Sequence, residues 1–305
     1  MTRYLLGRLG RMILVVFALI TVTFVLSRSV GDPVSIMLPL SSTPEDRARV
    51  RAELGLDEPL LVQYTDYMGD VLQGDLGDSI WQGTPALPLV LDRLPASFLL
   101  AGASVALAIL VGLPIGILGG LRPGSWMDKV STVSSSLSLS IPDFWLGIIL
   151  IFLFSVTLGW LPTSGYGTFA ALVLPAIALS LRPGGRLARV SREAVKNEMA
   201  KAYVVAGRAK GLQTHTLMWR HVLKNISVVV ITVLGYDFLF VFTGYAIGVE
   251  TVFDWPGVGR LAVLAVLNQD LTLISAIVVV TGVFIAVVNM FLDFLAAAID
   301  RRISL

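Results

Sequence analysis

The chain has 305 residues, of which 55% are hydrophobic and 14% are charged, whereas soluble domains carry about 25% charged residues. Together with a mean hydropathy of +0.82, this composition excludes a soluble globular domain and indicates an integral membrane protein. The net charge of +2 reflects topology rather than nucleic-acid binding, and the absence of cysteine excludes disulfides, thiolate chemistry and cysteine-ligated metals.

Apolar stretches between charged residues predict six membrane-spanning helices, since one span needs about 20 apolar residues. They lie at 12–27, 94–121, two within 130–181, one within 225–249 and one at 271–292. The turn-forming sequence 161–167 divides the long third stretch into two spans. A secretory signal peptide is the competing interpretation of the first stretch, but no small-x-small cleavage site follows it.

The distribution of Lys and Arg predicts that both termini are cytoplasmic. With the N-terminus inside, the inner segments hold 17 of these residues and the outer segments hold six. Residues 29–93 form the only sizeable outer segment, and this segment is rich in Asp and Glu. The expected division is therefore an N-terminal tail with the first helix at 1–28, an extracytoplasmic region at 29–93, and a core domain with five spans at 94–305.

Residues 182–225 form a basic segment between apolar stretches, predicted to be a cytoplasmic loop. It holds two acids, Glu193 and Glu198, and ten basic residues: Arg182, Arg186, Arg189, Arg192, Lys196, Lys201, Arg208, Lys210, Arg220 and Lys224. A segment of this charge orients the chain in the membrane. It is also long enough to be a docking element rather than a connector.

Within this segment the sequence predicts a short helix over 201–212. Spacings of three and four residues place small and apolar side chains on one face, namely Ala202, Val205, Ala206, Ala209 and Leu212. Gly211 is a good helix stop because its φ is unrestricted. Such a helix suits insertion into a groove on another protein, and a basic helix lying on anionic lipid is the alternative.

Motifs for catalysis and metal binding are missing from the sequence. There is no G-x-x-x-x-G-K-[ST] motif and no Gly-Lys dipeptide, so the chain does not bind ATP through a P-loop. His215 and His221 are six positions apart, a spacing that does not suit one helical metal-binding face. Without G-x-S-x-G or H-E-x-x-H, we predict no catalytic residue and no metal ligand.

The sequence AYVVAGRAKGL, followed by WRHVLKN, resembles the cytoplasmic "EAA" loop of ATP-binding-cassette (ABC) importer permeases. It is most similar to the dipeptide/oligopeptide branch of these binding-protein-dependent transport inner-membrane components. Four more segments resemble motifs of that family in the same order: 31–34 (GDPV), 54–80, 141–148 (IPDFWLGI) and 249–261 (VETVFDWPGVGRL). Three positions depart from the family pattern: Gly207 stands where alanine is usual, Asp143 where a small residue is usual, and Asp237 matches no family motif.

The resemblance implies a type I ABC importer permease fold, all-α with six transmembrane helices, an extracytoplasmic helical and loop insert after the first span, and a cytoplasmic coupling helix. It implies half of a translocation pore for di- or oligopeptides in the plasma (inner) membrane of a bacterium or archaeon. The implied partners are a second homologous permease, two ABC ATPase subunits or one heterodimer, and an extracytoplasmic binding protein. No cofactor is expected on this chain, since ATP and Mg belong to the ATPases.

By the same resemblance, one set of residues docks into a groove on an ATPase. These are Tyr203, Ala206, Gly207, Arg208, Ala209, Lys210, Gly211 and Leu212. Closure of the ATPase dimer would then pull this helix and rock the spans. The acidic outer region is expected either to dock the binding protein or to be a solvated face.

Three acids are candidates for the translocation pathway or gate. Asp237 lies within the fifth span, where a carboxylate is costly unless it faces water, the bundle interior or a cation. It could meet a cationic group of the substrate or make an interhelical hydrogen bond. Asp143 could contact substrate or cap the following helix, and Glu250 could serve a gate or the PGVG turn. A stand-alone secondary transporter or channel that uses the intramembrane aspartates is the alternative function.

Overall fold

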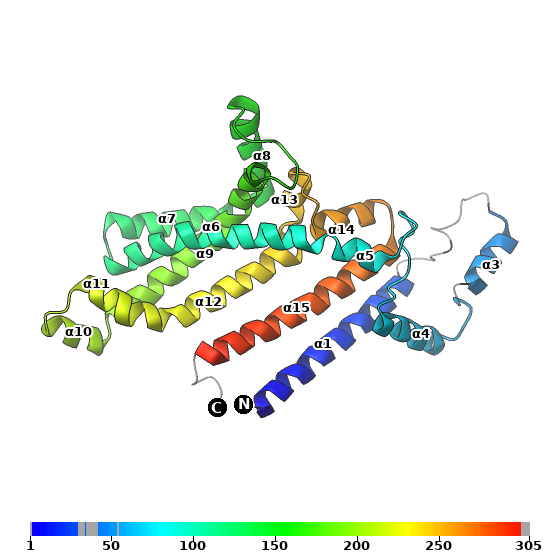
Figure 1. Cartoon of the computed structure of the whole chain (residues 1–305), viewed down its shortest axis with the longest axis horizontal. Helices are drawn as coiled ribbons and strands as arrows, with labels where there is room; N and C mark the ends of the chain where they lie inside the picture. Colours follow the sequence, from blue (N-terminus) through cyan, green and yellow to red (C-terminus); the bar gives the residue numbers. More distant parts are fainter. Residues whose placement is uncertain (1, 30–33, 35–41, 54, 300–305) are drawn as a thin grey trace. The chain divides into compact units, whose positions relative to one another are not determined.

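The computed structural model describes residues 2–29, 34, 42–53 and 55–299. These residues are helical apart from turns and one isolated bridge between Asp78 and Pro85. Residues 31–33 of the GDPV motif and the C-terminal Arg301 and Arg302 lie outside the described residues. The chain divides into two compact units, 1–95 with 260–290 and 96–259 with 291–305 (Figure 1).

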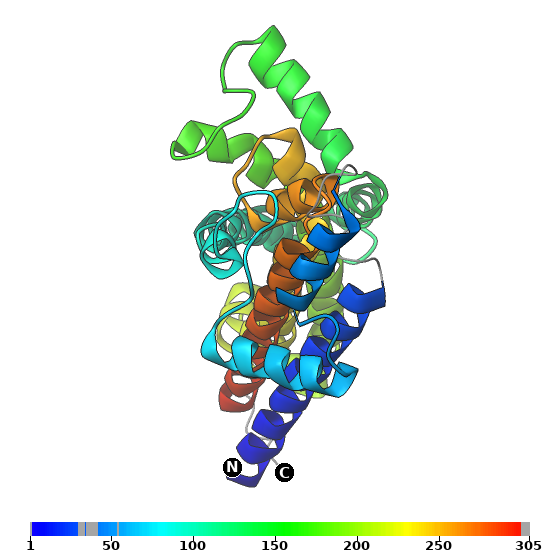
Figure 2. The ribbon, with the colours of Figure 1, turned by 90° about the vertical axis from the view of Figure 1, so that its right-hand side faces the viewer.

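The first unit contains α1 (Thr2–Ser29), α3 (Pro44–Glu53), α4 (Leu60–Gln73) and α5 (Ala86–Leu91). It also holds most of α14 (Val258–Leu267) and of α15 (Leu271–Ile299). The helical insert that the sequence predicts after the first span is thus present as α3, α4 and α5. Helices α1 and α15 run side by side (Figures 1 and 2). Their contact is close, since a Cβ added at Gly282 of α15 would lie 2.4 Å from Leu19 Cδ1 of α1.

The second unit is built around α9 (Phe169–Met199), against which α7 (Trp126–Ser140), α8 (Asp143–Leu150) and α12 (Leu223–Phe240) are packed. Helix α8 continues as a π-helical stretch, Ile151–Thr157. The unit also contains α6 (Leu94–Leu121), α10 (Ala202–Ala209), α11 (Thr214–Leu217) and α13 (Ile247–Val252), with π-helical stretches at Met218–Val222 and Val241–Tyr245. The residues 158–168 between the π-helical stretch and α9 are irregular, which confirms the turn predicted at 161–167.

Glycines spaced four apart bring α6 into backbone contact with α9. A Cβ at Gly112, Gly116 or Gly120 would lie within 2.5 Å of a backbone oxygen of α9. Small residues at this spacing therefore let the two helix backbones approach each other closely. The serines of α7 have the same packing role, since Ser131, Ser135 and Ser138 are buried.

Four helical stretches among the described residues are long and apolar enough to cross a membrane: 7–29, 86–121, 214–245 and 271–294. A fifth results if α7 and α8 with its continuation, bent by 97° relative to each other, form one broken span. The sequence predicts six spans, and the remaining one corresponds to α9. Helix α9 is long enough to span, but Arg182 and Arg186 lower the hydropathy of its middle part.

Candidate functional site

The predicted docking helix is present as α10, and it ends where the sequence places its stop. Gly211 has φ of +84°, in the left-handed region that favours glycine. Its N–H donates to Arg208 O at 2.9 Å, and Leu212 N–H donates to Gly207 O at 3.1 Å. These bonds satisfy carbonyls at the end of the helix and reverse the chain direction toward α11.

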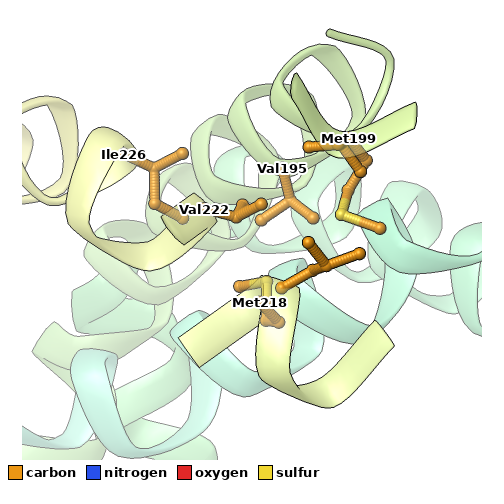
Figure 3. Packing of buried hydrophobic residues seen from close by; sticks show 7 residues of the cluster. Val195, Met199, Met218, Val222 and Ile226 are labelled. Carbon is orange, nitrogen blue, oxygen red and sulfur yellow. The ribbon is translucent and has the colours of Figure 1, made fainter. Parts of the chain in front are cut away.

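Helix α10 buries one face and exposes the face of small residues. Val204 joins an apolar cluster of Val195, Met199, Leu217, Met218, Val222 and Ile226, part of which Figure 3 shows. On the same side, a Cβ at Gly207 would lie 2.7 Å from Leu217 Cδ2, so the glycine allows close packing. The predicted small-residue face of Ala202, Val205, Ala206 and Ala209 is exposed. The structure therefore anchors one side of α10 and leaves the other side accessible.

A buried carboxylate, Glu198, ties α10 to two long helices. It lies at the end of α9 and accepts hydrogen bonds from Tyr203 Oη at 2.9 Å and from Asn225 Nδ2 at 2.7 Å. Lys201 Nζ lies 2.6 Å from its second oxygen. Burial opposes ionisation, but the bonds from Lys201, Asn225 and Tyr203 outweigh it and hold the pKa of Glu198 below its ordinary value. The carboxylate therefore joins α9, α10 and α12 as a charged, fully bonded group.

Sequence reasoning did not identify Glu198 or Asn225 as functional. Only Tyr203 of this group is among the predicted docking residues, and it is partly covered by its bond to Glu198. A possible signal is that Asn225 closes the WRHVLKN sequence that follows the docking helix. Nothing local in the sequence indicates that its amide reaches back to the end of α9.

A second group of charges lies between α8, α9 and α12. Arg186 Nη1 of α9 is 2.9 Å from Asp237 Oδ1 of α12, and the Asp237 side chain is 2% exposed. Gly184, between Arg182 and Arg186, lies against Ala108 in the middle of the 28-residue helix α6. Arg182 and Arg186 are each about 3 Å along the axis from that point, because a helix rises 1.5 Å per residue. The two arginines therefore lie within the length of α6, with Arg186 nearer its C-terminal end, because Gly112 and Gly116 contact Gly184 and Ala188.

Asp143 belongs to the same group. It is buried in the first turn of α8 and makes no capping hydrogen bond. Within the described residues both carboxyl oxygens lack a hydrogen-bond partner of normal geometry, while Arg182 and Tyr245 interact with the carboxyl group electrostatically. The Arg182 guanidinium carbon lies 4.7 Å from the centre of the Tyr245 ring. The capping alternative for Asp143 is thus not what the structure shows.

Glu250 occupies a closed structural environment. Its buried Oε1 accepts a hydrogen bond from Ser97 Oγ at 2.8 Å, and that hydroxyl accepts one from Val258 N at 2.9 Å. A Cβ at Gly257 would lie 2.1 Å from Glu250 Oε1, so the PGVG turn is folded directly over the carboxylate. Trp255 Nε1 donates to Ala96 O at 2.9 Å and fixes the same turn on α6. This geometry favours the turn role over direct substrate contact.

In the predicted outer region, a buried aspartate connects the insert to the last long helix. Asp270 accepts hydrogen bonds from Ser79 Oγ at 2.5 Å and from Trp81 N at 3.1 Å. Its other oxygen accepts from Leu273 N at 2.9 Å, in the first turn of α15. The residues the structure describes contain no group of three or more side chains that could hold a metal ion.

Two protein-family models match the chain. Residues 112–305 match the model described as "Binding-protein-dependent transport system inner membrane component". Residues 1–101 match the model described as "Binding-prot-dependent transport system membrane comp, N-term". Between them the two models cover nearly the whole chain.

Several relatives match over nearly their full length. The chain is 34% identical to the oligopeptide transport system permease protein AppB of Bacillus subtilis (strain 168), with 100% of both chains covered. It is 33% identical to the probable peptide ABC transporter permease protein y4tP of Sinorhizobium fredii (strain NBRC 101917 / NGR234), over 98% of both. It is 34% identical to the glutathione transport system permease protein GsiC of Salmonella choleraesuis (strain SC-B67), over 99% of both.

A solved structure shares the fold. A chain from inward-facing conformations of the MetNI methionine ABC transporter aligns with a TM-score of 0.56 at 15% identity. The alignment covers 70% of this chain and 96% of that chain. At this identity the likeness extends to the helical membrane fold alone.

Proposed function

Because the chain belongs to the family of binding-protein-dependent transport system inner membrane components and is a permease subunit of an ABC importer, we propose that it carries di- or oligopeptides. The peptide assignment is supported by relatives that are named as peptide, oligopeptide and glutathione permeases and match from end to end. The chain is a non-catalytic, multi-pass protein of the inner membrane. Its family membership argues against the alternative of a stand-alone secondary transporter or channel.

The proposed architecture is the six-span type I permease with cytoplasmic termini. In it, 1–28 form the N-terminal tail and first span, 29–93 form the extracytoplasmic region, and 94–305 form the core domain with the coupling segment 182–225. Helix α9 is the proposed span that its four arginines make less apolar than the others. Since α9 continues to Met199, the part of 182–225 available for docking is the region around α10.

The proposed coupling element is α10 with its Gly211 stop. The observation that carries this proposal is the division of the helix into an anchored face, at Val204 and Gly207, and an exposed face of small residues. Small side chains let an ATPase groove approach the backbone closely, whereas Arg208 and Lys210 are exposed at the end of the helix for polar contacts. The three bonds to Glu198 would transmit a pull on α10 to α9 and α12.

The proposed pathway residues are Asp237 and Asp143, and Glu250 has a supporting role in the turn that precedes α14. Both aspartates are buried and both lie next to arginines of α9. A second homologous permease would complete the pore, an extracytoplasmic binding protein would deliver the peptide, and two ABC ATPases carrying ATP and Mg would drive the cycle. ATP must bind one conformation more tightly than the other to shift their populations.

The test is reconstitution of the complete importer. The chain is co-purified with its partner permease, ATPases and binding protein, and ATPase activity in liposomes is measured with a tripeptide, glutathione, a sugar and a nickel chelate. We expect a stable complex whose ATPase activity and uptake are stimulated by the tripeptide. Stimulation by the sugar or the nickel chelate without stimulation by the tripeptide would overturn the peptide assignment and leave the importer function intact.

A further inference from the structure

A partly exposed arginine within a membrane-spanning helix needs a polar environment outside the chain. The side chain of Arg186 is 38% exposed, although Arg186 lies within the length of the apolar helix α6, on its C-terminal half. Charged side chains at this depth face the bundle interior, a partner or a water-filled cavity rather than lipid. The face that carries Arg186 therefore does not face hydrocarbon.

The neighbouring stripe of α12 supports the same conclusion. Tyr236 and Phe240 flank Asp237 along the helix, and their side chains are 57% and 43% exposed. The Arg186 guanidinium carbon is 5.9 Å from the centre of the Phe240 ring. One turn before and one turn after these aromatics, Thr232 and Thr243 are also exposed. Both threonine hydroxyls donate to carbonyls of their own helix, and Val229 is exposed one turn before Thr232. The phenol of Tyr236 and the guanidinium of Arg186 are therefore the polar groups that this face offers to water or to a partner.

Each charged side chain in this group has a neighbour of opposite charge, but some of its hydrogen-bonding atoms have no partner. Within the described residues, Asp237 Oδ2, both oxygens of Asp143 and Arg182 Nε are buried without a hydrogen-bond partner. These four atoms account for half of all such side-chain atoms in the described part of the chain. Buried polar atoms are nearly always bonded, so their gathering in one place marks a site at which bonds are exchanged.

Two arginines and two aspartates give the group a net formal charge of zero. Arg186 is exposed enough for the carboxylate of a free peptide to bind its guanidinium while Asp237 stays paired with it. A zwitterionic peptide brings no net charge into the site. The planar guanidinium is suited to this because it has five N–H donors and binds carboxylates in a two-pronged geometry.

We propose that Arg186, with Arg182 behind it, binds the α-carboxylate of a peptide in transit and sets a preference for substrates with a free C-terminus. This inference rests on the proposed peptide function. In the sequence, Arg182 and Arg186 serve only to predict on which side of the membrane their segment lies. Their position beside Asp143 and Asp237 becomes evident only in the structure.

The experiment compares trialanine with trialanine amide in liposomes that contain the complete importer. The binding protein is loaded to the same occupancy with each peptide, and uptake is expressed per loaded binding protein, so that selection by the binding protein cancels. Wild type is expected to transport the free acid at least about tenfold faster than the amide, a ratio that corresponds to about 1.4 kcal/mol. Arg186→Gln is expected to lower the acid-to-amide ratio of uptake to about one.

Two further variants separate recognition from folding. Arg189→Gln removes an exposed arginine one turn further along the same helix and should leave the acid-to-amide ratio unchanged. The double variant Arg186→Gln, Asp237→Asn removes both charges, so no unpaired charge stays buried, and it should show the same loss of preference as the single variant. If Arg186→Gln fails to assemble, the double variant alone decides the question.

The outcomes distinguish this inference from the proposed function. A wild-type importer that moves neither peptide but moves another class of solute overturns both. A wild-type importer that moves acid and amide equally, or variants that keep the wild-type ratio, overturn the role of Arg186 and leave peptide transport standing.

Discussion

The chain contains two groups of buried charged residues, and they differ in how completely their side chains are hydrogen-bonded. At the junction with α10, Glu198 is bonded by Lys201 and Tyr203, at the start of α10, and by Asn225 of α12. Between α8, α9 and α12, Asp237 has one arginine partner and Asp143 has no hydrogen bond of normal geometry among the described residues. A fully bonded buried network is rigid, whereas a buried polar group without its partners is costly. We assign the first group to the proposed coupling element and the second to the proposed translocation pathway.

The largest effect is expected from a charge placed on the docking face. Ala206→Glu puts a carboxylate into the groove that we assign to an ATPase, and an unpaired buried charge costs about 3 kcal/mol, or roughly a hundredfold in association. Gly211→Arg should act similarly by straining the left-handed position that ends α10. Uptake should fall while the purified chain keeps its thermal unfolding midpoint. Uptake and ATPase activity are measured in the reconstituted importer.

The control for this prediction is Gln213→Glu, which adds the same charge at an exposed position beyond Gly211. Unchanged uptake by Ala206→Glu at normal protein levels would contradict the docking role. If α10 instead lies on anionic lipid, wild-type uptake should be lost in liposomes of neutral lipid. In that case Ala206→Glu and Gln213→Glu should reduce uptake equally.

Breaking the under-satisfied pair should destabilise the protein more than removing it. Arg186→Gln leaves the carboxylate of Asp237, which is 2% exposed, without its partner and is expected to cost about 3–5 kcal/mol, whereas Asp237→Asn should cost less because Arg186 is 38% exposed. The double variant Arg186→Gln, Asp237→Asn should recover most of that loss, and the coupling between the two positions is read from a double-mutant cycle. The measurement is denaturant or thermal unfolding in detergent, followed by tryptophan fluorescence. Additive effects of the two substitutions would mean that the ion pair does not form in the protein.

Weakening the satisfied joint should loosen α10 without releasing its apolar face. Glu198→Gln removes the charge from three hydrogen bonds and should cost about 1–3 kcal/mol, whereas Tyr203→Phe removes one bond and about 1 kcal/mol. Hydrogen exchange at the amides of α10 is the readout, because a local effect there need not change global unfolding. Equal protection of α10 in wild type and Glu198→Gln would argue against the joint.

The direction of the pKa shift of Glu198 determines how the stability of this junction depends on pH. Since the pKa of Glu198 is lowered in the folded chain, its contribution is fully present above the ordinary glutamate pKa of about 4.3 and is lost as the pH falls through the lower folded value. Protection of α10 from exchange should therefore be constant between about pH 6 and 8 and should decline only in acid. In Glu198→Gln the acid decline of this region should be weaker.

The smallest effect is expected at Gly207, where the family pattern has alanine. Gly207→Ala gains up to about 1 kcal/mol of helix propensity. It loses about 1–3 kcal/mol because Leu217 must move away from the new methyl group. The net change should be a destabilisation of about 1 kcal/mol, which Leu217→Val in the same chain should reduce. A clear gain of stability in the single variant would show that Gly207 loosens α10 and does not serve its packing.

Much of the helical plan could be predicted from the sequence because it depends on local properties. Runs of apolar residues locate the helices that begin the chain, cover 94–121 and end the chain. The three-and-four spacing and the freedom of Gly211 place α10 and its end. The order of motifs from 54–80 to 249–261 points to the family that the full-length comparisons show.

The tertiary structure decided which charged groups meet. Arg186 and Asp237, or Glu198 and Asn225, are far apart in the chain, and their contact depends on how α9 and α12 pack. The glycines of α6 separately fix the register of α9 on α6, with Gly112 against Gly184. Hydropathy and charge counts are sums along the chain, so they assign Arg182 and Arg186 to a basic segment. Only the register between helices, set by side-chain volume across their interface, turns those two arginines into neighbours of Asp143 and Asp237.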